Sequence, residues 1–357
     1  MSQAKGQGRT RPSNTMRIFH SEAHRGHAGA MEMRYDKLIP MCESPDRMDT
    51  ILEALRAQGH QDIVEASSFG LEPVLRVHTP SFVSFLENCW PLWEAEFGPG
   101  GFATAYMFGM RGMDQLPNAS VHSMLSCYTF DVCVPIVAGT WSAIKSAVDT
   151  TLSAASFVKN GGEAAFALCR PPGHHASSDL AGGYCYVNNA AVAAQMLLDA
   201  GASRIAILDI DYHHGNGTQR IFYDRSDVLY ASIHATPERE YPFLLGYARE
   251  TGAAAGEGFN LNLPQPLGTT IAPYRAALQQ AVERVKAHGP DVLVVSLGVD
   301  SYIRDPVGGF ALESEDFLRL GADIKRIGLP TLFVMEGGYA IAELGLNTAN
   351  VITGFCN

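Results

Sequence analysis

A short stretch rich in acids and histidines, Asp209 to Asn216, has the spacing of a metal site. In its Asp-x-Asp-x-His pattern, alternate residues of an extended chain point to the same side, so Asp211 and His213 can converge on one point. Asp300 follows a separate apolar run and can join them. Such a set leaves a position open for water and substrate, as in catalytic Zn²⁺ sites, and its oxygens also suit Fe²⁺, Co²⁺ or Mn²⁺. The simpler alternative, that these side chains only cap the following helix, stays open on this pattern alone.

Two further groups could move protons or stabilise charge beside such a metal. His174 and His175 follow an Arg-Pro-Pro-Gly turn, which the prolines make rigid. A histidine can take a proton from water and return one to a leaving amine near neutral pH. Tyr339 follows a Glu-Gly-Gly turn and could donate its phenol to a carbonyl oxygen that becomes negative. Together with the metal pattern, these residues predict a metal-dependent amide hydrolase.

The elements that must position these residues alternate between short β-branched runs and Ala-rich stretches with helical spacing. This alternation predicts an α/β fold with a mostly parallel sheet flanked by helices on both faces. Four expected strands end directly before the chemical groups, and ligands bind at the carboxyl ends of such strands. The expected strands are 164–168, 204–210, 228–233, 292–297 and 331–335, and the expected helices are 46–58, 81–97, 189–199, 273–287 and 314–327.

The domain organisation predicted from the sequence is one catalytic domain over residues 16–357. Residues 1–15 lack an apolar core for a signal peptide and are expected to form a disordered leader. Residues from 98 to about 138 are expected to form a long inserted loop or small subdomain, and loops of this length are usually functional.

Composition narrows the class of protein further. The formal net charge of -11 repels nucleic acid on average, so we expect no nucleic-acid partner. No stretch approaches the ~20 apolar residues of a membrane span. The seven cysteines are odd in number and never form a CxxC pair, which favours a reducing, cytoplasmic location. The sequence contains neither a GxSxG serine-hydrolase elbow nor a phosphate-binding loop.

The motifs RPPGHH, GGYC, DIDYHHGNGT, LGVD and EGGY occur in this order, and together they resemble the histone deacetylase superfamily. Within it, the chain is most similar to bacterial acetylpolyamine amidohydrolases. The resemblance extends from Met16 to the carboxyl terminus. It implies the arginase/deacetylase α/β fold and hydrolysis of linear amide bonds.

The resemblance also implies a role for each matching residue. The metal ligands would be Asp211, His213 and Asp300. The catalytic set would be His174 as general base, His175 beside the leaving group, Tyr339 on the carbonyl, Asp209 orienting the first histidine and Asn216 orienting the second. The substrate tunnel would be lined by Gly183, Tyr184, Tyr241, Val307, Glu32 and Cys133. A structural K⁺ would bind Ser232 and main-chain oxygens of Asp209, Asp211, His213 and Ile233.

The inserted loop departs from the acetylpolyamine pattern. Glutamates that would receive the distal ammonium groups are missing from 116–122 and 130–135, and Cys133 stands in place of the nearer one. Glu32 still matches an acid near the tunnel mouth, and Asp131 or Asp114 could substitute from elsewhere. Burying an ammonium without a carboxylate is costly. We therefore expect a small N-acyl or N-alkyl amide as substrate, and both an acetylated polyamine or lysine and a neutral synthetic amide stay open.

Two rival functions belong to other classes. A binuclear manganese ureohydrolase would need more carboxylates and a further histidine than Asp209-x-Asp211-x-His213 offers. A non-catalytic binder of acyl ligands would need a damaged site, whereas every expected catalytic position is occupied. The resemblance further implies a homodimer or higher homo-oligomer, with the 98–138 insertion at the interface.

Overall fold

The computed structural model describes residues 16–34, 36–109 and 118–357. Its centre is an eight-stranded parallel sheet with the order β4-β1-β5-β10-β9-β6-β7-β8. Val, Ile and Leu dominate the inner strands because both faces of the sheet are covered. The strands are β1 (Arg17–His20), β4 (Ile63–Glu65), β5 (Ala164–Ala167), β6 (Ile205–Asp209), β7 (Val228–Ala235), β8 (Asn260–Gln265), β9 (Val292–Leu297) and β10 (Thr331–Met335). The predicted parallel sheet is confirmed.

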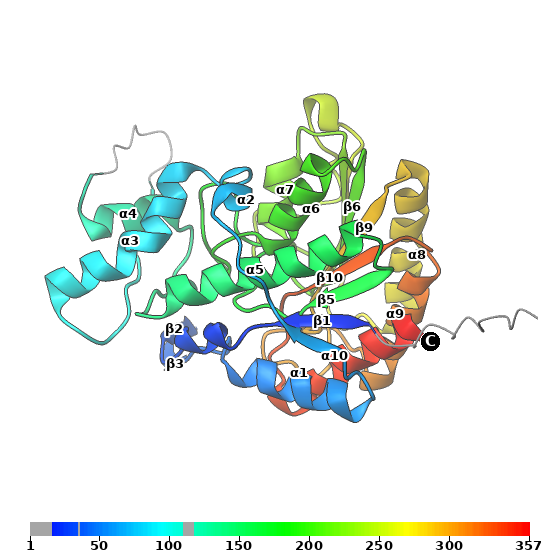
Figure 1. Cartoon of the computed structure of the whole chain (residues 1–357), viewed down its shortest axis with the longest axis horizontal. Helices are drawn as coiled ribbons and strands as arrows, with labels where there is room; N and C mark the ends of the chain where they lie inside the picture. The colour runs from blue at the N-terminus through cyan, green and yellow to red at the C-terminus, as the bar shows by residue number, and fades with distance from the viewer. Residues whose placement is uncertain (1–15, 35, 110–117) are drawn as a thin grey trace, which may run out of the picture.

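Helices cover both faces of this sheet (Figure 1). The helices of one face are α5 (Thr140–Lys159), α6 (Asn189–Asp199) and α7 (Asn216–Phe222). Those of the other face are α1 (Asp46–Ala57), α8 (Ile271–His288), α9 (Ser314–Lys325) and α10 (Ile341–Cys356). The faces follow from right-handed crossovers, since connections that move along the sheet in opposite directions place their helices on opposite sides.

Most of the remaining elements gather on the side toward which the strands run (Figure 1). They are η1 (Glu22–Gly26), the antiparallel hairpin β2 (Met31–Arg34) and β3 (Lys37–Pro40), α2 (Glu72–Leu75), α3 (Pro80–Phe97) and α4 (Val121–Tyr128). The short η2 (Ala254–Gly256) lies instead near the start of β7, where Ala253 N donates to the Tyr223 carbonyl. The described part of the 98–138 insertion contains α4 and a bridge between Ala103 and Ile136. It is therefore more ordered than a plain loop. The expected leader, 1–15, and Asp114 lie outside the described residues.

Several elements were not predicted from the sequence. Strands β1 and β4 are only four and three residues long, so neither shows a periodicity. Strand β8 carries Asn and Pro, residues that are depleted in strands, and it lies at the sheet edge where they are tolerated. Helices α5 and α10 are rich in Thr, Ser or Gly, which weakens the helical signal.

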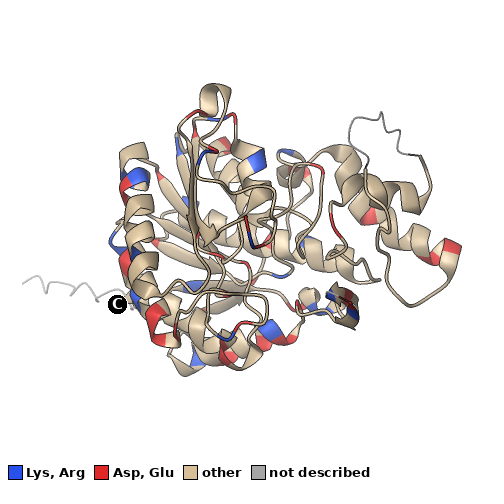
Figure 2. Ribbon diagram, turned by 180° about the vertical axis from the view of Figure 1, so that it is seen from behind, with Lys and Arg blue, Asp and Glu red and all other residues tan. Residues whose placement is uncertain are grey.

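The surface agrees with the composition. Figure 2 shows Lys and Arg positions spread over many helices and loops among Asp and Glu positions. Among the residues that the structure describes, no helix is long and apolar enough to cross a membrane.

Candidate active site

Four neighbouring strands bring the predicted chemical groups together. β5, β10, β9 and β6 are consecutive in the sheet, and each ends directly before one of the polar motifs. The parallel register aligns these ends, with Asp209 of β6 opposite Ser296 of β9. Motifs that lie far apart in the sequence therefore meet at one edge.

The three predicted metal ligands form a compact cluster there. One ligand atom from each of Asp211, His213 and Asp300 lies within 4.8 Å of the others. The His213 Nδ1 atom lies 3.0 Å from Asp300 Oδ2 and 3.4 Å from Asp211 Oδ1. The other carboxylate oxygens are held by main-chain amides, since Gly337 N donates to Asp211 Oδ2 over 2.8 Å and Tyr212 N donates to Asp300 Oδ1 over 2.9 Å.

Two glycines make room for these carboxylates. A Cβ atom on Gly298 would collide with the Asp211 carboxylate, and one on Gly337 would collide with the carboxylates of both Asp211 and Asp300. The glycines of the LGVD and EGGY motifs thus allow the backbone to approach the cluster closely.

The electrostatics of this cluster favour a bound cation. Burial and the neighbouring Asp211 charge raise the pKa of Asp300 to about 7. Although burial opposes a charged imidazole, the Asp211 and Asp300 carboxylates raise the pKa of His213 to about 10. Two buried carboxylates beside one imidazole therefore attract positive charge, and this donor set fits a divalent metal ion.

His174 is held by a buried carboxylate. Its Nδ1–H donates to Asp209 Oδ2 over 3.0 Å, and the Tyr230 hydroxyl donates to the same oxygen over 2.9 Å. Despite the opposing effect of burial, the charges of Asp211 and Asp209 raise the pKa of His174 to about 10. This ring is thus built to hold a proton, with Nε2 left for a partner in the cavity.

His175 has a different environment. Its Nδ1–H donates to the side-chain oxygen of Asn216 over 2.7 Å, so a neutral amide stands where the first histidine has a carboxylate. Burial, followed by the charges of His174 and His213, lowers the pKa of His175 well below its usual value. The ring centroids of the two adjacent histidines are 4.0 Å apart, and their pKa values shift in opposite directions.

Tyr339 is fixed through its backbone and its ring. Asp305 Oδ2 accepts from the Tyr339 amide over 2.7 Å, and the Arg47 guanidinium lies 4.8 Å from the ring centroid. Arg47 also donates to the Gly338 carbonyl over 2.7 Å. The phenol itself is left to face the cavity, since Tyr339 is one of its lining residues.

Glu336 has a positioning role that sequence reasoning missed, although its EGGY motif was noted. Its Oε2 accepts from the amides of Gly173 and His174 over 2.7 and 3.1 Å, which ties β10 to the histidine turn. Burial raises the pKa of Glu336 to about 7. An acid ending a buried apolar strand was the available signal, because such a group needs a buried partner.

A cavity of about 350 Å³ opens above these groups. All six predicted tunnel residues line it, together with His174, His175, Asp211, His213 and Tyr339; the full wall adds Met33, Arg34, Pro172, Glu240, Phe243, Pro306 and Gly308. Asp209, Asn216 and Asp300 lie behind this wall. A Cβ on Gly183, whose φ is +54°, would collide with the His175 ring and the Tyr241 hydroxyl, so this wall position requires glycine.

The two acidic side chains near the cavity, Glu32 and Asp131, differ in how many hydrogen bonds they already accept. The Tyr184 hydroxyl donates to Glu32 Oε2 over 2.5 Å, while the buried Oε1 has no hydrogen-bond partner among the described residues. Asp131 already accepts three hydrogen bonds, because Cys133 N donates to its Oδ1 and both Gly183 N and the Tyr241 hydroxyl donate to its Oδ2. This carboxylate therefore supports the tunnel wall, and its substitution for the missing glutamate stays a prediction.

The residues expected to hold K⁺ also lie together. Asp209 of β6 pairs in register with Ser232 of β7, and the Ser232 hydroxyl lies 2.7 Å from His234 Nδ1. Ile233 follows in β7. Their role in binding K⁺ stays a prediction.

Comparison with known proteins gives a consistent family. The histone deacetylase domain matches residues 41–355. Acetylpolyamine amidohydrolase 2 of Pseudomonas aeruginosa is 48% identical over 340 residues, covering 95% of this chain and 98% of its own. Acetylpolyamine amidohydrolase of Mycoplana ramosa is 44% identical over 339 residues, covering 95% and 99%. The crystal structure of acetylpolyamine aminohydrolase from Burkholderia pseudomallei superposes with a TM-score of 0.90 at 38% identity, covering 96% and 98%.

These matches span nearly the whole chain, and they agree with the sheet topology and with the motifs at the strand ends. The arginase/deacetylase fold is thereby confirmed, as is the expectation of a hydrolase that acts on amide bonds. The chain belongs to the histone deacetylase domain family.

Proposed function

We propose that the chain hydrolyses a small N-acyl or N-alkyl amide with a Zn²⁺ ion held by Asp211, His213 and Asp300. The observation that carries the proposal is the convergence of this ligand set, the histidine pair and Tyr339 at one cavity. A divalent cation at this site supplies Lewis-acid polarisation of the amide carbonyl and makes water a better nucleophile. Fe²⁺, Co²⁺ or Mn²⁺ would also fit these donors.

Three residues of the chain, His174, His175 and Tyr339, act on the protons and the carbonyl oxygen of the reaction. A cation held by Asp211 would offset the charge that raises the pKa of His174, and His174, held through Nδ1 by Asp209, can then accept the proton of the attacking water at Nε2. The Tyr339 phenol donates a hydrogen bond to the carbonyl oxygen as that oxygen becomes negative. The proton taken from the water then passes to the departing amine, beside which His175 is held through Nδ1 by Asn216.

The wall of the cavity supports a substrate with little or no positive charge. Away from the catalytic groups, its charged residues are Glu32, Glu240 and Arg34. The Arg34 guanidinium therefore offsets the negative charge of one of the two glutamates. Met33, Phe243 and Val307 add apolar surface. Glu32 lines the cavity and its Oε1 has no hydrogen-bond partner among the described residues, which keeps acetylated polyamines and acetyl-lysine as the second candidate substrates.

A substrate panel tests this proposal. The metal-loaded chain would be assayed with acetylputrescine, an acetyl-lysine peptide, a neutral anilide and an N-methyl amide. We expect the neutral amides to be hydrolysed with kcat/KM at least equal to that of acetylputrescine. A strong preference for acetylputrescine would favour the second candidate, and failure to hydrolyse any of the amides would contradict the proposed reaction.

The assembly and location are proposed on weaker physical grounds. A homodimer or higher homo-oligomer with 98–138 at its interface would cover exposed apolar side chains such as Tyr106 and Met107. Light scattering at micromolar protein tests this assembly, and a monomeric mass would contradict it. All seven cysteines are free, which supports the cytoplasm as the location.

A further inference from the structure

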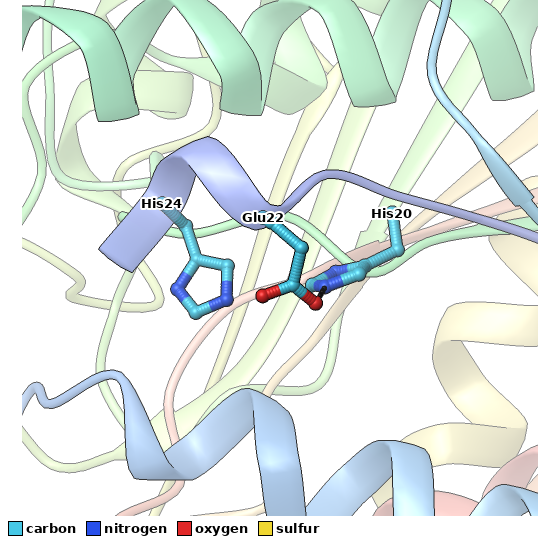
Figure 3. Close-up of side chains that lie close together, drawn as sticks. All are labelled: His20, Glu22 and His24. Carbon is cyan, nitrogen blue, oxygen red and sulfur yellow. Dashed lines mark hydrogen bonds and ion pairs between the residues drawn. The ribbon is translucent and has the colours of Figure 1, made fainter. Parts of the chain in front are cut away.

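A second cluster of metal-binding side chains lies where the chain leaves β1. His20 ends β1, and Glu22 and His24 belong to η1. Figure 3 shows the Glu22 carboxylate between the two imidazole rings. One ligand atom from each residue lies within 4.8 Å of the others, and the ring centroids of the two histidines are 5.2 Å apart. None of the three residues belongs to the active site described above.

His24 is the least satisfied member of this cluster. The residue is 2% exposed, and neither of its ring nitrogens has a hydrogen-bond partner in the part of the chain that the structure describes. A buried polar group without a partner costs free energy, so its position needs an explanation. Burial, with smaller contributions from His20 and Arg170, lowers the pKa of His24 to about 4.

His20 is oriented as metal-binding histidines usually are. Its Nδ1 lies 3.3 Å from the Leu168 carbonyl oxygen, to which Nδ1–H can donate. This contact directs Nε2 toward Glu22 Oε1, 3.4 Å away. A hydrogen bond from the far ring nitrogen to a carbonyl fixes the tautomer and the ring orientation of a ligand histidine.

Glu22 completes the set and leaves it accessible. Its Oε2 accepts from Arg25 Nε over 2.5 Å, whereas Oε1 faces the histidines. Arg25 is also paired with Asp49 of α1, which offsets its charge near the cluster. The Glu22 side chain is 62% exposed, so an ion can enter and water can fill a remaining coordination position.

We propose that His20, Glu22 and His24 bind a divalent transition-metal ion at a site separate from the active site. Two imidazoles, one carboxylate and a water form a set that zinc accepts in tetrahedral geometry. Imidazole donors favour Zn²⁺, Co²⁺ and Ni²⁺ over Mg²⁺ and Ca²⁺.

This ion would stabilise the backbone that holds the catalytic turn. Arg170, four residues before His174, donates to the carbonyls of His24 and His27 over 2.8 and 2.5 Å. Fixing η1 through its side chains therefore also fixes two acceptors of Arg170. The site has a structural role in this account and takes no part in the chemical step.

Metal counting on the full chain tests the proposal. The protein would be stripped of metal, equilibrated with Zn²⁺ and dialysed, and the bound ions per chain would be measured by elemental mass spectrometry. We expect two ions in the wild type, one in Glu22→Gln, one in His24→Gln and one in Asp300→Asn. His60→Gln is the matched control, because His60 is a buried histidine outside both clusters, and it should keep two ions.

A thermal measurement separates the two sites. In the Asp300→Asn background, added Zn²⁺ should raise Tm, and the further change Glu22→Gln should abolish that rise. One ion in the wild type would overturn the proposal, as would two ions retained by both cluster variants, which would place the second ion elsewhere. If His24→Gln loses its native circular dichroism, Glu22→Gln decides alone, since its exposed side chain can change without disturbing the core.

Discussion

The strand-end cluster and the cavity mouth are built in opposite ways. At the strand ends, Asp209, Asp211 and Asp300 are buried, and main-chain amides or neighbouring rings hold each of them. At the mouth, Met33 and Phe243 are each 53% exposed and come from a hairpin and a loop. A rigid, fully bonded cluster can fix a reaction, whereas exposed side chains on loops can change without disturbing it. The molecule thus separates the reaction from the choice of substrate.

The largest effect should come from the ligand Asp300. Asp300→Asn removes a charge from the metal site, and we expect kcat/KM to fall by more than about 1000-fold, because both water activation and carbonyl polarisation depend on the ion. Steady-state assays with bound-metal analysis measure this. Glu240→Gln, at the cavity mouth, serves as the control and should change kcat/KM far less. Comparable losses of kcat/KM in the two variants would contradict the proposed difference between the strand-end cluster and the cavity mouth.

Tyr339→Phe should have the next largest effect. Removing one oxyanion donor costs about 2.7 to 4 kcal/mol, which corresponds to a loss of about 10²–10³ in kcat. Because the Tyr339 backbone is held by Asp305 and its ring lies near Arg47, folding and metal content should stay unchanged. Wild-type turnover by a folded Tyr339→Phe protein would remove the phenol from the mechanism.

Metal affinity at the strand ends should depend on pH. The pKa of His213, raised to about 10, lies above the ordinary value, so the metal-free ring holds a proton at neutral pH that the ion must displace. Affinity should therefore rise by about tenfold per pH unit for each proton released, or about 100-fold between pH 6 and pH 8. Zn²⁺ titration of activity in metal buffers measures this dependence. An affinity that stays constant over this range would show that the free site carries no such proton.

The smallest effect on activity should come from a substitution at the cavity mouth. Glu32→Gln should lower kcat/KM for acetylputrescine by about 10- to 150-fold, since hydrogen bonds to charged groups contribute about 1.5–3 kcal/mol. The neutral anilide should be hydrolysed as before. Equal losses of kcat/KM on both substrates would assign Glu32 a structural role through Tyr184. The cavity mouth would then affect the reaction itself as well as the choice of substrate.

The residues at the strand ends could be predicted from the sequence, whereas the short strand β1 and the side-chain cluster beyond it could not. Asp211, His213 and Asp300 follow long apolar runs, so their meeting at one sheet edge follows from parallel topology. The short β1 carries no periodic signal, and the His20–Glu22–His24 cluster beyond it was not foreseen. Its donors depend on the turn of η1 against α1, which is a tertiary contact.

The same limit applies at the mouth. The single hydrogen bond to Glu32 and the three to Asp131 depend on which hydroxyls and amides reach each carboxylate. The resemblance to the family pointed to Glu32, but the residue types and spacing do not show which hydrogen bonds either acid makes. Hydrogen-bond partners brought from distant segments decide which one can receive a substrate.

The most direct test of the central claim is metal reconstitution in the Glu22→Gln variant, which isolates the strand-end site. The chelated protein would be titrated with Zn²⁺ while hydrolysis of a neutral anilide is followed. We predict no activity without metal and full recovery at one bound ion per chain, with no recovery when Asp300→Asn is added. Full activity in the metal-free protein, or recovery that does not require Asp300, would contradict a metal-dependent reaction at the strand ends.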